Sequence, residues 1–181
     1  MAYSLEDFCG DARALLAEGS GREGRDEMRQ NLETLLGDAG FQEDYLAEDD
    51  ESGLTQIYED PDFGFCVLIY NMAEARTSPP HDHGSSWAIY GQASGYTDMS
   101  EWRRKDAGGD DKADLEKVRA YRLYPGKAGL YDVGDIHAID YPAKSKFVRV
   151  TGTDMSKEAR LIFDTEAGTV KKIEHVGTGE E

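Results

Sequence analysis

From about residue 54 onward, the chain is built of short segments rich in β-branched and aromatic residues. Pro-Gly, Gly-Asp or charged turns separate these segments, and no internal repeat at solenoid spacing is present. Short strands with such regular turns are typical of an all-β sandwich or barrel. We expect the charged, glycine-containing stretch 103–116 to be a solvated connection, with a lid as the alternative. The predicted strands are 65–70, 87–90, 117–124, 129–133, 147–151 and 160–163.

The first 40 residues carry apolar side chains at helical spacing in two runs. We expect one helix from about Leu5 to Leu16 and a second around Met28 to Leu36, each followed by glycine. The apolar stripes of both helices predict a helical cap that packs on the β-structure.

The length of 181 residues fits one domain with a single core. We expect a single domain over residues 1–181, with the helical cap at 1–45, the β-barrel at 54–165 and a frayed tail at 176–181. The only cysteines, Cys9 and Cys66, cannot form a disulfide framework or a zinc ribbon.

Acidic residues outnumber basic ones, 37 against 20, so the formal net charge is −17. Such a charge repels phosphate backbones and anionic membrane surfaces, so we expect no nucleic-acid partner and no membrane partner. The first residues show no basic region followed by an apolar run, and no stretch approaches ~18 apolar residues. We therefore expect a cytoplasmic protein that is a monomer or a homodimer.

Three of the four histidines form a pattern that suits a metal site. His81 and His83 are separated by one residue, and residues i and i+2 of a strand point to the same side. His137 follows 54 residues after His83, behind a Gly-Asp turn. A barrel could bring the three imidazoles together. A chance H-x-H pair and an ordinary turn histidine at position 137 remain the alternatives.

Two segments around these histidines resemble the two cupin motifs. Residues 79–95 (PPHDHGSSWAIYGQASG) are similar to the first motif, and residues 126–140 (GKAGLYDVGDIHAID) to the second. The apolar run 65–72 followed by H-D-H also resembles cysteine dioxygenase and related thiol dioxygenases. The similarity covers about residues 50–165. It implies a mainly β fold, the cupin double-stranded β-helix or jelly-roll barrel, with a metal in its mouth and the helices as an N-terminal cap.

The resemblance also implies the metal ligands. Many cupins carry a glutamate a few residues after H-x-H, but residues 84–88 (GSSWA) contain no carboxylate. This absence matches the three-histidine variant of the thiol dioxygenases. The implied ligands are therefore His81, His83 and His137, and the implied cofactor is Fe(II).

Other positions depart from the thiol dioxygenase pattern. Ala88 stands where the mammalian-type enzyme has a cross-linked cysteine, so we expect no Cys–Tyr cross-link. The strand 147–151 (FVRVT) lacks the family's serine–histidine–tyrosine set, and Arg149 stands about where the histidine would be. The family's carboxylate-binding arginine has no evident match near Thr55. Free L-cysteine is therefore not the expected substrate.

Three neutral imidazoles leave a divalent metal with its full positive charge. Such a site favours an anionic, chelating substrate such as a thiolate, an enolate or a hydroxy acid. Adjacent open positions can take both the substrate and O2, which makes Fe(II) the expected metal for oxygen chemistry. Zinc with hydrolytic chemistry is the competing interpretation.

Arg149 is the candidate for binding a substrate carboxylate, because it lies on the opposite strand face from Val148 and Val150. It points either into the barrel mouth or to solvent. Weaker candidates are Arg76, Arg103 and Arg104, for which a loop or surface position is the alternative.

We expect aromatic walls at the site, and name Tyr70 and Trp87 as substrate-contacting residues. Tyr90 is a further candidate, although each of these side chains is more often a core residue. Asp135 either orients a ligand imidazole or forms a turn after Gly134. We expect Cys66 to be a buried strand residue and assign no role to His175.

These observations predict a non-haem Fe(II)-dependent dioxygenase with a small anionic organic substrate and O2 as its partners. The expected reaction oxidises a thiol to a sulfinate, with Arg149, Tyr70 and Trp87 around the substrate. Other cupin chemistry, such as diketone cleavage, isomerisation or lyase chemistry, is the first alternative. A non-enzymatic ligand-binding cupin is the second.

Overall fold

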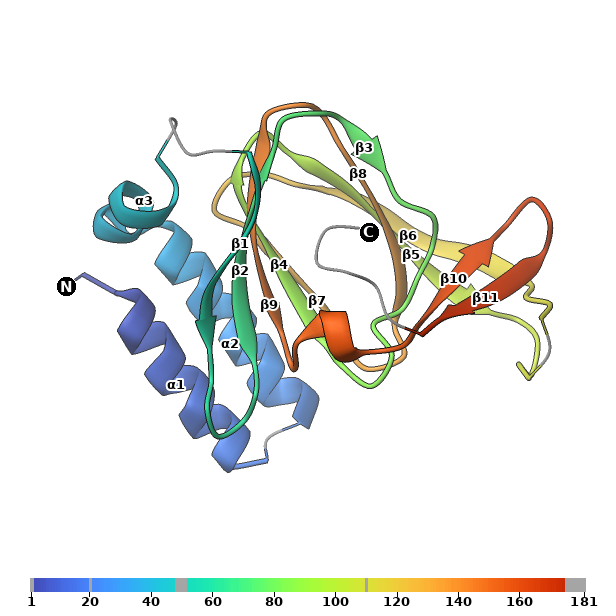
Figure 1. Ribbon diagram of the computed structural model, residues 1–181, viewed down its shortest axis with the longest axis horizontal. Coiled ribbons are helices and arrows are strands. Elements are labelled where there is room, and N and C mark those ends of the chain that lie inside the picture. Colours follow the sequence, from blue (N-terminus) through green and yellow to red (C-terminus); the bar gives the residue numbers. More distant parts are fainter. Residues whose placement is uncertain (1, 20, 48–51, 110, 175–181) are drawn as a thin grey trace.

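Among the described residues of the computed structural model, the two larger β-sheets face each other, and three α-helices cover the outer side of one of them (Figure 1). The structure describes residues 2–19, 21–47, 52–109 and 111–174. The helices are α1 (Leu5–Ala17), α2 (Gly21–Leu36) and α3 (Ala39–Tyr45), with a 3-10 turn η1 (Met155–Lys157). The strands are β1 (Gly53–Glu59), β2 (Cys66–Met72), β3 (Arg76–Thr77), β4 (Ala88–Ser94), β5 (Thr97–Arg104), β6 (Leu115–Leu123), β7 (Ala128–Tyr131), β8 (Ile136–Tyr141), β9 (Ser145–Thr151), β10 (Arg160–Asp164) and β11 (Thr169–Ile173).

Eight of the strands pair as one long hairpin that has been rolled up. β2 pairs with β9, β3 with β8, β4 with β7 and β5 with β6, all antiparallel. Rolling this hairpin gives one sheet in the order β1-β2-β9-β4-β7 and a second in the order β3-β8-β5-β6. Nested antiparallel pairs split between two facing sheets define a jelly roll. The predicted fold class, a mainly β jelly-roll barrel with N-terminal helices, is therefore confirmed.

Strand alternation divides the interior into two layers. On β2, Val67 and Ile69 pack toward the helices, whereas Leu68 and Tyr70 point between the two sheets. Arg149 on β9 lies opposite Leu68 on one side and Tyr90 on the other, so it also faces the space between the sheets. The site residues therefore come from the inward-facing positions of these central strands.

The helical layer follows the predicted apolar stripes. Met28, Leu32 and Leu35 of α2 are fully buried against the sheet. Gly91 on β4 permits this approach, because a Cβ there would lie 2.7 Å from the Leu36 side chain. The sequence analysis missed α3, which begins after Asp38, whose side chain accepts a hydrogen bond from the Phe41 N–H at 3.0 Å. No described helix is long and apolar enough to cross a membrane.

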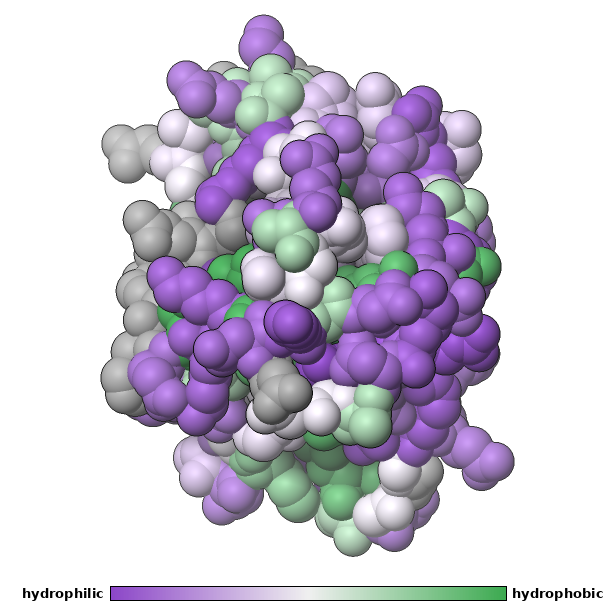
Figure 2. Space-filling model, turned by 90° about the vertical axis from the view of Figure 1, so that its right-hand side faces the viewer, coloured by the Kyte–Doolittle hydropathy of each residue, from purple (hydrophilic) through white to green (hydrophobic). Residues whose placement is uncertain are grey.

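Two hairpins differ from the prediction. Arg103 and Arg104 belong to β5, and residues 115 and 116 already belong to β6, so the connection predicted at 103–116 is shorter. Arg103 pairs with Glu116 across the two strands on an exposed surface. The hairpin β10–β11 continues the chain beyond the predicted barrel end at residue 165. Figure 2 shows the side of the molecule carrying these hairpins, where hydrophilic residues predominate.

Candidate metal centre

Backbone pairing brings the two predicted histidine clusters together. His81 forms a bridge with His137, in which each backbone N–H donates to the other's carbonyl, at 2.8 and 3.0 Å. Residues that face each other across an antiparallel pair carry their side chains on the same side. The segment 81–83 lies outside the named strands, but His81 bridges to strands on both sides, since it also pairs with Ile162.

The three imidazoles converge inside the barrel. His81, His83 and His137 are between 0% and 2% exposed, and their ligand nitrogens all lie within 4.8 Å of one another. The Nε2 atoms of His83 and His137 are 3.3 Å apart. Two imidazole nitrogens bound at ~2.1 Å to one metal ion lie roughly 3.0–3.4 Å apart. The observed spacing therefore fits two ligands of a single ion.

Each histidine is held in the neutral form that a metal requires. Burial lowers the pKa of His81 to about 4, and it lowers those of His83 and His137 well below their usual range. The nearby charge of Arg149 lowers all three further. Each of the three rings therefore keeps one unprotonated nitrogen at neutral pH, and the lone pair of that nitrogen is available to a metal.

The backbone selects the nitrogen that His81 presents. Its Nδ1 lies 3.0 Å from the carbonyl oxygen of Pro79, so Nδ1 carries the proton and donates it. Its Nε2 is buried and has no hydrogen-bond partner among the described residues. A bound metal ion would satisfy this buried, unprotonated nitrogen, which lies near the other two imidazoles. The residues present thus fit one divalent ion with three histidine ligands.

Tyr90 lies beside the ligand nitrogens. Its hydroxyl is 3.2 Å from the Nε2 of His83, and its side chain is 2% exposed. Burial raises the pKa of Tyr90 to about 12, so the phenol keeps its proton at neutral pH. The hydroxyl can therefore donate to an anion bound next to His83.

Arg149 points into the barrel rather than to solvent. It is 4% exposed, and its guanidinium lies over the rings of Tyr70 and Tyr90, 4.8 and 5.9 Å from their centroids. Its Nη1 donates to the Tyr90 hydroxyl at 3.5 Å. Tyr70 in turn stacks on Phe147 at 4.7 Å. The structure therefore brings Arg149 and Tyr70 together beside the histidines.

Arg160, which the sequence analysis did not single out, is also buried at the centre. It is 7% exposed at the start of β10. Burial lowers its pKa, and the charges of Arg149 and Arg76 lower it further. Arg76, on β3, forms a hydrogen bond with Tyr141. No sequence signal separates Arg160 from an ordinary charge at a strand end.

Other predicted residues do not reach the histidines. Trp87 lies three residues before Tyr90, so it faces the other side of β4 and packs in the layer beneath the helices. Asp135 accepts a hydrogen bond from the Asp132 N–H at 2.8 Å and pairs with Arg22 at 3.2 Å, which makes it a turn residue. Arg103 and Arg104 pair with acidic residues outside the barrel. His175 and the predicted tail 176–181 lie outside the described residues.

Cys66 is a buried strand residue, as expected. Burial raises its pKa to about 11, so the thiol stays protonated. It therefore has no thiolate character at neutral pH.

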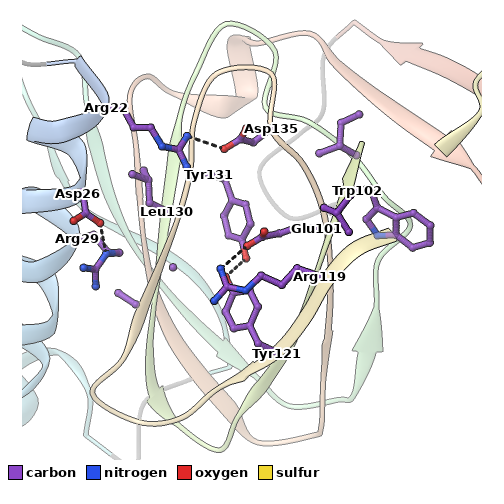
Figure 3. A pocket seen from close by; sticks show the side chains of 14 residues that line it. Arg22, Asp26, Arg29, Glu101, Trp102, Arg119, Tyr121, Leu130, Tyr131 and Asp135 are labelled. Atoms are coloured by element: carbon purple, nitrogen blue, oxygen red, sulfur yellow. Dashed lines mark hydrogen bonds and ion pairs between the residues drawn. The ribbon is translucent and has the colours of Figure 1, made fainter. Parts of the chain in front are cut away.

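A separate groove of about 530 Å³ lies behind Tyr131, between α2 and strands β5 to β7 (Figure 3). The ring of Tyr131 stacks on His137 with centroids 3.9 Å apart, and its hydroxyl meets that of Tyr121 at 2.7 Å. Charged residues of the groove pair with one another, as Arg119 does with Glu101. Tyr131 therefore forms a wall between this groove and the histidine cluster.

No protein-family model and no curated protein matches the chain. Among solved structures, KdgF from a Halomonas species is similar, with 14% identity and a TM-score of 0.42 over 54% of this chain and 74% of that one. The cupin domain of Schizosaccharomyces pombe Cnp3 has 9% identity and a TM-score of 0.43, over 59% and 66% of the two chains. The DMSP lyase DddQ from Ruegeria pomeroyi has 15% identity and a TM-score of 0.42, over 66% and 53%. These similarities concern the strand arrangement only, and the jelly-roll assignment rests on the strand pairing described above.

Proposed function

We propose that this chain is a metal-dependent cupin enzyme that acts on a small anionic organic substrate. The specific reaction that we propose is the Fe(II)-dependent oxidation of a thiol to a sulfinate by O2. The observation that carries the proposal is the convergence of three neutral, buried imidazoles with a buried guanidinium and a phenol. A three-imidazole site and an arginine together favour a ligand that is negatively charged.

The metal, when bound, would bring the thiolate and O2 into adjacent positions and accept electron density from sulfur. In the balanced reaction, both atoms of O2 end on the sulfur of the thiolate, which becomes a sulfinate. His81, His83 and His137 would hold the ion. Substrate binding and charge stabilisation would come from other side chains, chiefly Arg149 and Tyr90.

In this proposal Arg149 binds a carboxylate of the substrate. Its planar guanidinium matches a carboxylate with two parallel hydrogen bonds. The rings of Tyr70 and Tyr90 hold the guanidinium in place, and the surrounding residues keep bulk water out. The Tyr90 hydroxyl donates a hydrogen bond to negative charge that develops beside His83.

One observation favours a second candidate, in which the site isomerises or eliminates instead of oxidising. A protonated Tyr90 next to a ligand nitrogen is also placed to transfer a proton to a bound enolate. In that case the zinc-loaded protein should exchange the α-protons of a 2-oxo acid with D2O under nitrogen. The Tyr90→Phe variant should lose this exchange, and NMR would measure it.

The direct test is anaerobic loading with Fe(II), followed by O2 uptake against panels of thiols, diketones and hydroxy acids. We expect uptake with at least one anionic thiol, and one sulfinate formed per O2 consumed, as measured by mass spectrometry. When a variant of the buried Arg149 is assayed in the same way, Arg103→Met, which alters an exposed arginine on β5, serves as the matched control. Absence of uptake with every thiol by iron-loaded protein would refute the thiol assignment.

A further inference from the structure

Side chains, rather than backbone bonds, close the barrel on the side of β6 and β7. These two strands are the last in the order of their sheets, and among the described residues no backbone ladder joins them. Across this seam the hydroxyls of Tyr121 on β6 and Tyr131 on β7 meet at 2.7 Å. The contact is one hydrogen bond, whereas neighbouring strands within each sheet are joined along their length.

The two tyrosines separate the groove of about 530 Å³ from the metal centre (Figure 3). Both side chains line the groove, and the ring of Tyr131 also stacks on His137, with centroids 3.9 Å apart. One aromatic ring therefore lies between the groove and a ligand imidazole.

The metal centre needs a passage of this kind. Its three histidines are between 0% and 2% exposed, and Tyr131 is 1% exposed. A molecule from solution therefore reaches the ligand nitrogens only when a surrounding side chain moves. The groove already brings solvent as far as the tyrosine pair.

Tyr121 is the tyrosine that is free to move. Tyr131 is packed against His137, whereas Tyr121 is only partly buried and lies on an edge strand. The cover over its ring is the guanidinium of Arg119, 4.3 Å from the ring centroid. Arg119 is 62% exposed and forms a long ion pair with Glu101, at 3.5 Å, and exposed pairs of this kind contribute little stability.

Gly129, next to Tyr131 but one on β7, makes room for the hydroxyl pair. A Cβ at this position would lie 2.9 Å from the Tyr121 hydroxyl and 3.6 Å from that of Tyr131. Any larger residue would push the Tyr121 hydroxyl away, so the closed seam depends on the glycine.

We propose that the groove is the entrance to the metal centre and that Tyr121 is its gate. Small anions that bind the metal enter when the Tyr121 side chain turns away from Tyr131, and they leave by the same route. This inference rests on the metal centre of the proposed function, but on no particular reaction there.

Azide binding to the Co(II)-loaded protein, followed by stopped-flow absorbance, tests the gate without turnover. A gate changes the association and dissociation rates by the same factor, so the dissociation constant stays the same. Tyr121→Phe removes the hydroxyl that closes the seam, and both rates should rise about 2- to 12-fold, the factor that corresponds to one neutral hydrogen bond. Gly129→Ala keeps the hydroxyl but displaces it, so both rates should rise in this variant too.

Val118→Trp tests the groove itself. Val118 lines the groove and is 50% exposed, so a larger ring there fills the passage without touching the histidines. Both rates should fall roughly 10-fold, since binding then waits for the added ring to move aside. Tyr124→Phe and Val133→Trp make the same two changes at exposed positions outside the groove lining, and they should leave both rates within about twofold of the wild type.

Unchanged rates in both Tyr121→Phe and Val118→Trp would overturn the inference. So would a change in the association rate or the dissociation rate alone, because a residue that supports the bound state shifts the dissociation constant. Failure of the proposed thiol oxidation gives a different result. In that case no thiol drives O2 uptake by the iron-loaded protein, whereas the azide rates still respond to Tyr121→Phe and Val118→Trp.

Discussion

Replacing Gly84 by alanine tests how closely the ligand segment is packed against β10. Gly84 has φ +62°, a conformation that costs any residue with a Cβ about 1–2 kcal/mol. A Cβ there would also lie 2.1 Å from the carbonyl oxygen of Ala159, whereas ordinary contact begins at 3.4 Å. Since the obstructing atom belongs to the backbone, the turn must open or residues 158–160 must shift. We expect a total loss of about 2–4 kcal/mol in unfolding free energy.

Urea unfolding of Gly84→Ala and Gly126→Ala isolates the effect of this contact. Gly126 has φ +80° with no atom within 4 Å of a Cβ, so its replacement should cost only the conformational part, about 1–2 kcal/mol. Gly84→Ala should also bind zinc more weakly, because opening this turn displaces the neighbouring ligand His83 relative to His81 and His137. Equal losses of stability in the two variants, with unchanged zinc affinity, would refute the close packing of the ligand segment on β10.

Three further predictions address the substrate, acid stability and ligand support. Arg149→Lys should lower kcat/KM for an anionic thiol roughly 10- to 150-fold at unchanged metal content, since a hydrogen bond to a charged group contributes about 1.5–3 kcal/mol. An equal loss of kcat/KM for the neutral ester of the same thiol would contradict a contact between Arg149 and the carboxylate. Burial raises the pKa of Asp60, but backbone N–H groups and Arg13 lower it to about 2, from an ordinary 3.8. Its stabilisation is therefore present above pH 4 and lost between about pH 4 and 2, and urea unfolding should show Asp60→Asn to be less stable at pH 7, with a flatter acid dependence. Tyr131→Leu should weaken zinc binding about 2- to 10-fold in a chelator competition, because it removes the ring stacked on His137, and unchanged affinity would show that the stack does not support the ligand.

The barrel could be predicted from local pattern, and the grouping of the three histidines from the resemblance of two segments to the cupin motifs. A continuous apolar run marks the central strand β2, and the H-x-H spacing places two imidazoles on one side of the chain. Helix α3 and strand β5 were missed because their local sequence patterns are weak. The helix has only seven residues, and the strand carries polar residues on its solvent face.

Tertiary structure decides that Arg160 is buried at the centre of the barrel and that Tyr90, rather than Trp87, faces the histidines. Arg160 has the composition of a surface charge, and only the pairing of β10 with the H-D-H segment turns it inward. Trp87 and Tyr90 are an odd number of residues apart, so one strand cannot present both at the site. The residue that faces the histidines is Tyr90, because the odd-numbered positions of β4 pack against the helices.

The central claim is that three neutral imidazoles, and no carboxylate, bind one divalent metal. X-ray absorption of the protein reconstituted with a single metal measures this directly, together with metal analysis of each His→Ala variant. We expect one ion per chain, scattering from three imidazole nitrogens, and loss of most of the metal when His81, His83 or His137 is replaced. Full occupancy in the His137→Ala variant, or carboxylate oxygens from the protein among the ligands, would contradict the account.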